Sequence, residues 1–291
     1  MAVKNSITKA VVQKLSLTEY LNQDAISNHI YSVVGGQRGP TFIAGLVSAV
    51  TVNEALKGCT PQSLLSASLL GEALKLTPSP SMGMYYMVPF KAKEKRDKDG
   101  NIIKPACMEA QFQLGYRGYI QLAARSGQYK KLNAIAIKEG ELVRYDALNE
   151  EIEVNLIEDE EKREQAKTIG YYAFFEYLNG FRKAIYWSKA KMEHHASTYS
   201  QGYAAKKGYT FWEKNFDEMA RKTMLRQLIS KWGIMSIELE KAYTTDQAVI
   251  GEDGSPNYVD FDEDPIEEAV NEVKADRADD PTSVLFGEGN A

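Results

Sequence analysis

Three polar residues spaced four positions apart have the chemistry to hold a phosphate backbone. Arg117, Gln121 and Arg125 fall on one face of an expected helix, because side chains at i and i+4 align. Gln128 lies close to the same row. Guanidinium and amide groups on one side of a helix can bind phosphates and sugars. An ordinary solvated helix has the same spacing, so the row alone leaves both interpretations open.

An expected strand and a glycine position this row. Residues 108–114 alternate apolar and polar side chains, as in a half-buried strand, and the helix follows directly. The helix should end at Gly127, since glycine readily takes the left-handed conformation that closes a helix.

Basic and aromatic residues also occur together elsewhere in the chain. Basic groups neutralise phosphates, and aromatic faces stack on unpaired bases. Most of the 17 tyrosines should nevertheless serve packing, so single aromatic residues are ambiguous. Tyr86 belongs to an arm, residues 82–90, that contacts either bases or a neighbouring protomer. The candidate binding residues of this kind are Lys189, Lys191, Lys206, Lys207, Tyr86 and Tyr116.

Three further cations interrupt an otherwise apolar helix. Apolar residues cover most of the circumference of residues 213–232, which predicts a helix packed on several sides. Arg221, Lys222 and Arg226 are costly to bury alone, so each must reach solvent, a carboxylate or a phosphate. The spacing of Glu218 and Lys222 is that of a surface ion pair.

The charge is unevenly divided along the 291 residues. Residues 246–291 contain 14 acidic and two basic residues, which leaves 33 basic and 26 acidic residues in the part before them. A basic body with an acidic tail suggests a polyanionic partner and a separate interaction segment, although a disordered tail can also simply aid solubility. Two cysteines and no long apolar run predict a soluble protein of a reducing cytoplasm.

The sequence lacks the motifs of several catalytic classes. It has no G-x-x-x-x-G-K-[ST] phosphate loop, no cysteine pair with zinc-ligand spacing and no G-x-S-x-G element. We therefore expect no cofactor, no metal and no enzymatic activity. A metal-dependent nuclease stays open as an alternative, because four acids are free to converge in space. These acids are Glu109, Glu139, Glu141 and Glu176.

The order of expected elements indicates an α+β fold. Residues 1–80 are mainly helical, residues 82–187 form mainly antiparallel strands, and residues 188–237 are helical again. The clearest hairpin joins residues 168–177 to residues 181–187 through Asn179-Gly180. We expect an antiparallel sheet core with packed helices, a domain over residues 1–245, and a disordered acidic tail over residues 246–291.

Three blocks closely resemble the RecT family of phage and prophage single-strand annealing proteins. They occur in the family's order and together are specific. The blocks are PQSLLSASLLGEALKL at residues 61–76 leading to YMVPF at 86–90, LGYRGYIQLAARSGQY at 114–129, and FWEKNFDEMARKTMLRQLISKWG at 211–233.

The resemblance implies a function. Such proteins bind single-stranded DNA, anneal complementary strands without nucleotide hydrolysis, and assemble as rings and helical filaments on DNA in phage recombination. Their partners are single-stranded DNA, the annealed duplex, and a phage exonuclease or host single-strand binding protein that contacts the acidic tail. For this chain, it places DNA binding and oligomerisation in residues 1–245, in the cytoplasm of a bacterial host. Arg117, Arg125, Lys206, Lys207, Arg221 and Arg226 are expected to build the basic groove.

Three other functions remain as alternatives. A metal-dependent phage nuclease would degrade DNA, and a passive single-strand coating protein would slow annealing. A coating protein of the oligonucleotide-binding barrel type needs a compact five-stranded unit, against which the expected long helices argue. A phage assembly protein would oligomerise without regard to DNA.

Overall fold

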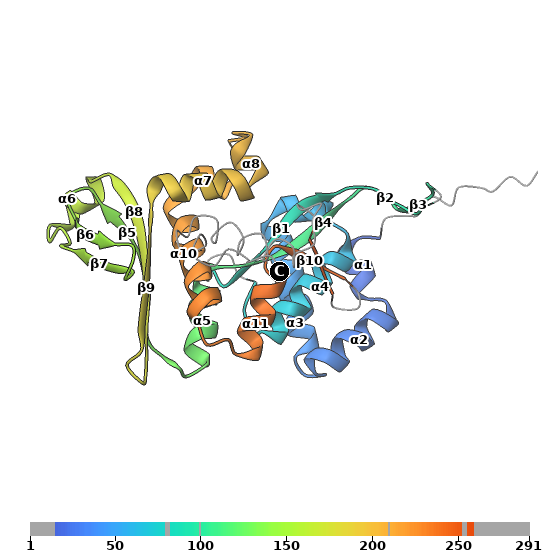
Figure 1. Ribbon diagram of the computed structural model, residues 1–291. Helices are drawn as coiled ribbons and strands as arrows, with labels where there is room; N and C mark the ends of the chain where they lie inside the picture. The colour runs from blue at the N-terminus through green and yellow to red at the C-terminus, as the bar shows by residue number, and fades with distance from the viewer. Residues whose placement is uncertain (1–14, 79–81, 99, 209, 252–254, 259–291) are drawn as a thin grey trace, which may run out of the picture.

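The structure is a computed structural model that describes residues 15–78, 82–98, 100–208, 210–251 and 255–258. It contains antiparallel sheets and helices, which confirms the predicted α+β class. Helices α5 (Tyr116–Arg125), α10 (Phe216–Trp232) and α11 (Ile237–Thr245) lie between a four-stranded sheet with its N-terminal helices and a three-stranded sheet (Figure 1). No helix in the described ranges has the length and apolar character needed to cross a membrane.

The N-terminal helices pack on one face of the four-stranded sheet. Thr60 caps α4, since its hydroxyl accepts a hydrogen bond from the Ser63 N–H at 3.4 Å, and Pro61 follows at the first helical position. Leu64 and Leu70 are among the side chains of α4 buried in the core. The elements are α1 (Leu17–Leu21), α2 (Asp24–Val34), α3 (Gly39–Val52), the 3₁₀ helix η1 (Glu54–Gly58) and α4 (Pro61–Ala73).

The four-stranded sheet includes a segment that the sequence analysis assigned to the tail. Its order is β1-β4-β10-β11, with β1 (Tyr85–Ala92), β4 (Cys107–Leu114), β10 (Ala248–Ile250) and β11 (Pro256–Tyr258). β2 (Lys95–Arg96) pairs with β3 (Ile102–Lys104) toward the tip of the β1–β4 arm. All three residues of β10 are buried, so the folded part extends past the boundary predicted at residue 245. The strand was not predicted because it is short and acidic residues flank it in the sequence.

The three-stranded sheet has the order β5-β8-β9. Its strands are β5 (Tyr129–Lys138), β8 (Thr168–Tyr177) and β9 (Arg182–Ser188). The predicted turn at Asn179-Gly180 joins the last two, and Gly180 has a φ of +86°. A side hairpin of β6 (Leu142–Asp146) and β7 (Glu151–Val154) leads to α6 (Glu160–Gln165). Asp159 caps this helix, since its carboxylate accepts a hydrogen bond from the Lys162 backbone N–H at 3.1 Å.

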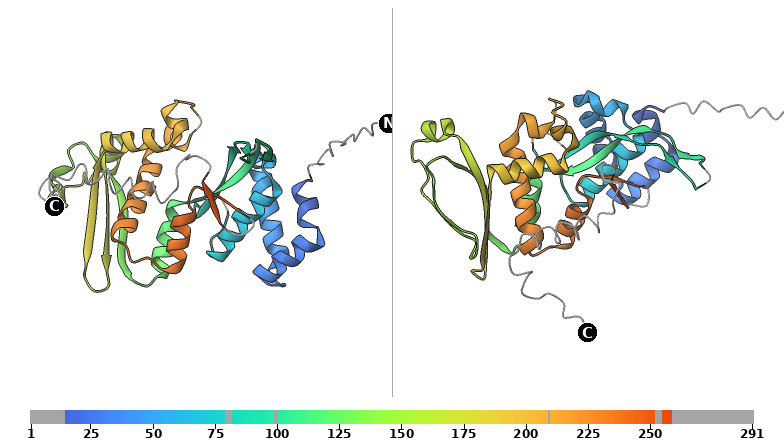
Figure 2. Two further views of the ribbon diagram at one scale, coloured as in Figure 1. Left: turned by 45° about the vertical axis from the view of Figure 1, so that its right-hand side comes forward. Right: turned by 45° about the horizontal axis from the view of Figure 1, so that its top comes forward.

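The last helices differ from the prediction at one point. The helix predicted over residues 213–232 is two helices, because Asn215 has non-helical backbone angles (φ −139°, ψ 56°). Ser188 caps the helix after β9. Figure 2 shows α7 and α10 beside the three-stranded sheet from two further directions. The helices are α7 (Lys189–Tyr199), α8 (Gln201–Ala204), α9 (Phe211–Lys214), α10 (Phe216–Trp232) and α11 (Ile237–Thr245).

A buried carboxylate joins the C-terminal segment to the centre of the molecule. Asp246 is fully buried, and its two oxygens accept hydrogen bonds from the Leu114 N–H at 2.7 Å and the Tyr119 hydroxyl at 3.0 Å. The ammonium of Lys222 lies 3.8 Å from the same carboxylate. Burial lowers the pKa of Lys222, and the charge of Asp246 partly offsets that effect. One side chain therefore connects β4, α5 (Tyr116–Arg125), α10 and the segment before β10.

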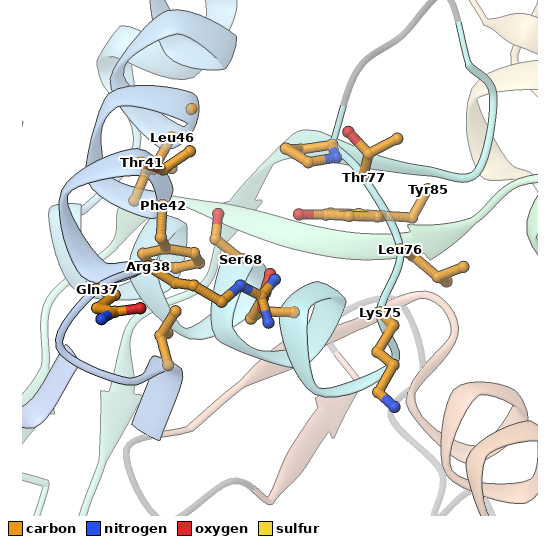
Figure 3. Close-up of a pocket in the computed structure, with 14 residues that line it drawn as sticks. Gln37, Arg38, Thr41, Phe42, Leu46, Ser68, Lys75, Leu76, Thr77 and Tyr85 are labelled. Atoms are coloured by element: carbon orange, nitrogen blue, oxygen red, sulfur yellow. Dashed lines mark ion pairs between the residues drawn. The ribbon is translucent and has the colours of Figure 1, made fainter. Parts of the chain in front are cut away.

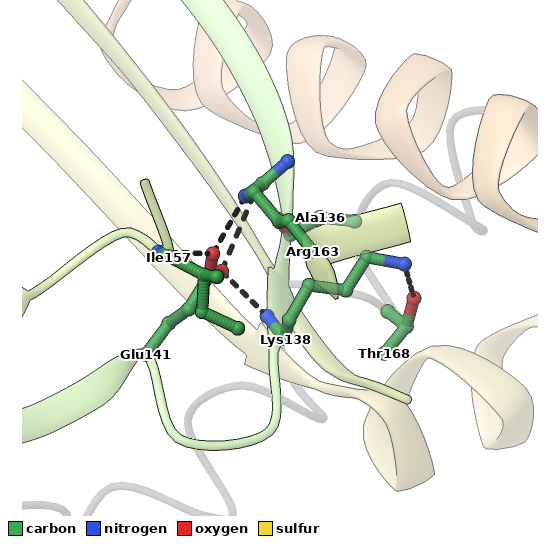
Figure 4. Close-up of polar contacts among 6 residues, drawn as sticks. All are labelled: Ala136, Lys138, Glu141, Ile157, Arg163 and Thr168. Atoms are coloured by element: carbon green, nitrogen blue, oxygen red, sulfur yellow. Dashed lines mark hydrogen bonds and ion pairs between the residues drawn. The ribbon is translucent and has the colours of Figure 1, made fainter. Parts of the chain in front are cut away.

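A second buried carboxylate connects the turn after β5 with α6. Glu141 accepts hydrogen bonds from the Arg163 guanidinium at 2.6 Å, the Lys138 N–H at 2.7 Å and the Ile157 N–H at 3.2 Å (Figure 4). Burial acts to raise the pKa of Glu141, but these hydrogen bonds and the charge of Arg163 outweigh it and lower that pKa. The pair attaches α6 to the turn between β5 and β6.

We expect Asp246→Asn to lower the free energy of unfolding by about 3 kcal/mol, because the buried Lys222 ammonium loses its counter-charge. Urea denaturation followed by circular dichroism measures this change. Asp24→Asn removes an exposed carboxylate from the start of α2 and should change stability by about 0.5 kcal/mol or less. Equal stability of the two variants would contradict the role assigned to Asp246.

We expect Glu141→Gln to remove a pH-dependent part of the stability. The pKa of Glu141 is lowered in the folded state, so its stabilisation is complete above its ordinary pKa of 4.5 and is lost as the pH falls through the lowered value. The stability difference between wild type and variant should therefore be largest near neutral pH and shrink in acid. Denaturation curves at several pH values measure this, with the exposed Glu153→Gln as the control. A difference that stays constant with pH would contradict the prediction.

Candidate nucleic-acid interface

The first turn of α5 is held directly against the backbone that leads into β1. The Gly115 N–H donates to the Met84 carbonyl at 2.8 Å. A Cβ atom at Gly115 would lie 2.1 Å from the Gly83 carbonyl oxygen, and one at Gly118 would lie 2.1 Å from the Met84 carbonyl oxygen. Only glycine fits at these two positions, so the backbones approach each other without intervening side chains.

This close approach brings Arg117 near Tyr86. A methyl group placed on Gly83 would lie 3.2 Å from the Tyr86 hydroxyl oxygen and 3.7 Å from Cδ of Arg117, so both side chains face the same point. Arg117 is exposed and Tyr86 is half-buried. The structure thus places an exposed guanidinium, which forms no ion pair with the described residues, beside a tyrosine that comes from another sequence block.

The N-terminal half of α10 supplies the other side of this region. The Arg221 guanidinium faces the Tyr116 ring, 6.0 Å from its centroid, and forms an ion pair with Glu218. This pairing replaces the predicted contact between Glu218 and Lys222. Burial raises the pKa of the Tyr116 hydroxyl, which keeps it a neutral hydrogen-bonding group.

The predicted lysines lie on neighbouring elements. Lys206 and Lys207 are exposed in the loop between α8 and α9, where their N–H groups donate to the Tyr203 and Gly202 carbonyls at 2.9 and 3.1 Å. The Lys189 ammonium lies 5.8 Å from the centroid of the Phe216 ring at the start of α10. Lys191 is exposed, and its ammonium lies 4.8 Å from the centroid of Trp187 on β9.

Three predicted binding residues make contacts within the protein. Arg125 donates to the carbonyls of Leu74 and Lys75, both at 2.8 Å, and so ties the end of α5 to the end of α4. Lys222 is 8% exposed and pairs with Asp246, so it does not reach the surface predicted for it. The Arg226 guanidinium lies 5.0 Å from the centroid of the Tyr243 ring.

The predicted row on α5 is therefore divided. Arg117 and Arg125 stand eight residues apart, which is about 12 Å along a helix, and only Arg117 belongs to the region around the first turn. Gln121 lies between them and is half-buried. The helical spacing correctly predicted that the three side chains lie on one face. It did not show that Arg125 donates hydrogen bonds to two backbone carbonyls.

The acids considered for a metal-dependent nuclease do not converge. Glu141 pairs with Arg163, whereas Glu176 pairs with Lys130, and Glu109 lies in the other sheet on β4. Within the described ranges, no group of three or more histidine, cysteine, aspartate or glutamate side chains is arranged to hold a metal ion.

A pocket that the sequence did not reveal lies between α3, α4 and β1. It has a volume of about 470 Å³ (Figure 3), and Arg38, Ser68, Lys75 and Tyr85 are among its lining residues. Arg38 forms an ion pair with Glu72 on its wall. Three separate segments build the pocket, so no local pattern could have predicted it.

Comparisons with known proteins give consistent results. The family model described as "RecT family" matches residues 41–260. The chain is 36% identical over 266 residues to "Uncharacterized protein YqaK" of Bacillus subtilis (strain 168), covering 89% of this chain and 82% of that protein. It is 28% identical over 247 residues to "Protein RecT" of Escherichia coli (strain K12), covering 84% of this chain and 82% of that protein.

We expect Gly118→Ala to destabilise the protein by about 1–3 kcal/mol, because the new methyl group collides with the Met84 carbonyl and must displace backbone. Thermal and urea denaturation measure the loss. Gly45→Ala is the matched control, since this helical glycine has no atom within 4 Å of the added Cβ position. Alanine should be neutral there or stabilise α3 by up to about 1 kcal/mol. Gly118→Ala with the stability of Gly45→Ala would contradict the assigned close contact.

Proposed function

The chain belongs to the RecT family, and on that premise we propose that it binds single-stranded DNA and anneals complementary strands without ATP. Family membership supports a role in recombination, with DNA binding and annealing. The proposed active form is an oligomer, a ring or filament on DNA, in the cytoplasm of a bacterial host.

One observation carries the proposal: the three family-like sequence blocks meet at the first turn of α5. Tyr86 comes from the first block, Tyr116 and Arg117 from the second, and Arg221 from the third. The meeting point presents cations and tyrosines together, the side chains suited to phosphates and unpaired bases. Lys189, Lys206 and Lys207 extend the same basic region along α7 and the α8–α9 loop.

In the proposed mechanism, the protein binds the backbone of a strand, and base pairing with a second strand recognises its sequence. Arg117, Arg221 and the loop lysines bind phosphates and so position the strand. These phosphate contacts carry no sequence information. Bases left free of the protein are then tested by a second strand through Watson–Crick pairing. The annealed duplex stays bound to the same basic region. Affinity should fall steeply with salt, because each neutralised phosphate releases counterions.

The tail partners stay part of the proposal. The folded domain now includes β10 and β11, so the proposed interaction tail is shorter than predicted and begins after residue 258. The acidic residues beyond it, with the Val284-Leu285-Phe286 set, lie outside the described residues. We propose that they contact a phage exonuclease or a host single-strand binding protein.

Arg117→Ala combined with Arg221→Ala should slow strand annealing by roughly tenfold or more, since two phosphate contacts are lost. The slope of log affinity against log salt should fall in magnitude by about 1.4 for a single strand. Annealing of labelled complementary oligonucleotides and binding titrations at several salt concentrations measure both effects. The control is Arg144→Ala with Lys162→Ala, which removes two exposed cations, with side chains 71% and 77% exposed, from the β6 and α6 side. Annealing at the wild-type rate in the first double variant would contradict the assignment.

The same assay separates the alternative functions. Annealing returns both labelled strands intact as duplex, whereas a nuclease would shorten them when Mg²⁺ or Mn²⁺ is added. A passive coating protein would slow duplex formation below the rate without protein. An assembly protein would form the same filaments whether or not oligonucleotide is present.

A further inference from the structure

We propose that Phe211 and Tyr86 form a stacking site for one unpaired nucleobase of the bound strand, beside Arg117. The inference rests on the proposed function and deepens it, because it states where the protein contacts a base rather than the backbone. Phe211 was not among the residues that the sequence singled out.

Phe211 is held outward by the way α9 begins. Thr210 and Glu213 form a reciprocal cap, in which the Glu213 N–H donates to the Thr210 hydroxyl at 3.3 Å and the Thr210 N–H donates to the Glu213 carboxylate at 3.0 Å. In this short helix Trp212 turns inward and packs edge-on against Phe216 at 5.2 Å. The preceding Phe211 therefore faces solvent, and it is 54% exposed.

The exposed ring has an aromatic partner from a distant segment. The centroids of Phe211 and Tyr86 are 6.3 Å apart, and the rings are tilted by 39°. This distance is near the long end for an aromatic pair, and more than half of Phe211 stays open despite the contact. The two rings thus offer apolar faces that a flat ligand can cover.

The charges around the pair favour a ligand with phosphates. The Tyr86 hydroxyl and the Arg117 side chain face the same point beside Gly83, and Lys214 is exposed on α9 itself. Of two acids in this segment, Glu218 is paired with the Arg221 guanidinium. Glu213 keeps its charge and accepts hydrogen bonds from the Gly208 N–H and the Thr210 hydroxyl. An open aromatic face next to an exposed guanidinium matches a nucleotide whose base is not stacked in a duplex.

An unpaired base is favoured over a second copy of this chain as the occupant. An apolar side chain from another protomer would leave the adjacent Arg117 without an anionic partner, whereas a nucleotide supplies both the ring and the phosphate. A base within a duplex has both faces covered by its neighbours, so the site selects unpaired nucleotides.

The test compares an intact oligothymidylate with an oligonucleotide of the same length that carries abasic sites. Wild-type full-length protein should bind the abasic oligonucleotide more weakly. Phe211→Ala should weaken binding of the intact oligonucleotide by about 5- to 100-fold and lose most of the discrimination against abasic sites. Phe211→Trp should keep both. Phe211→Leu, which is apolar but not aromatic, should behave like Phe211→Ala. Fluorescence anisotropy at fixed salt measures the affinities.

Two controls separate stacking from other effects. Arg117→Ala should weaken binding of both oligonucleotides by the same factor and lower the salt slope, because it removes a phosphate contact. Leu148→Ala, at an apolar residue 91% exposed in the β6–β7 turn, should change neither affinity.

Three results would overturn the stacking site. The first is wild-type discrimination against abasic sites in Phe211→Leu. The second is an equal loss of affinity for both oligonucleotides in Phe211→Ala. The third is a changed oligomeric state of Phe211→Ala without DNA, measured by sedimentation velocity, which would assign the face to a second copy of the chain. If wild type itself neither bound nor annealed single strands, the proposed function would fail as well, so the two failures are distinguishable.

Discussion

The buried carboxylate of Asp246 fixes the three elements on which the site is built. It binds the last residue of β4, one position before the glycine that starts α5, and it binds Tyr119 in the second turn of that helix. On α10 it pairs with Lys222, the neighbour of Arg221. A buried ion pair is a poor source of net stability, because both charges must leave water. Its consequence here is geometric: β4, α5 and α10 meet at one point and in one arrangement.

The cations of this protein divide according to what surrounds them. Arg125 donates to backbone carbonyls, and Arg163 and Lys222 pair with buried carboxylates, so these three cations make contacts inside the fold. Arg117, Lys206 and Lys207 are exposed. The net charge of the body thus overstates the charge available to a polyanion, and the location of the free cations matters more than their number. Arg117 lies in the first turn of α5, and Lys206 and Lys207 lie in the loop before α9.

The local features of the fold could be predicted from sequence, and the long-range ones could not. Thr60 and Ser188 cap helices within three residues, and Asn179 and Gly180 lie in the three-residue loop between Tyr177 and Phe181, so each signal is complete in a short window. The hydrogen bonds of Asp246 with Leu114 and Tyr119 join residues more than a hundred positions apart. They were not predicted because Asp246 begins an acidic segment that was assigned to the tail. Periodicity also missed the break at Asn215, because apolar residues continue on both sides of it. The partner of Arg125 is a pair of backbone carbonyls, which has no sequence signature at all.

The glycines of the block at residues 114–129 connect a local sequence feature with a long-range contact. Gly115 and Gly118 lie three residues apart, yet both contact the distant residues Gly83 and Met84. The sequence around α5 alone does not reveal these contacts. With any larger residue there, α5 would stand away from β1, and Arg117 would lose its place beside Tyr86. An annealing protein must hold a strand firmly and leave most bases free for pairing. A phosphate contact and a ring face fixed to each other through backbone can meet both demands, because a single held base sets the register while its neighbours stay open to the second strand.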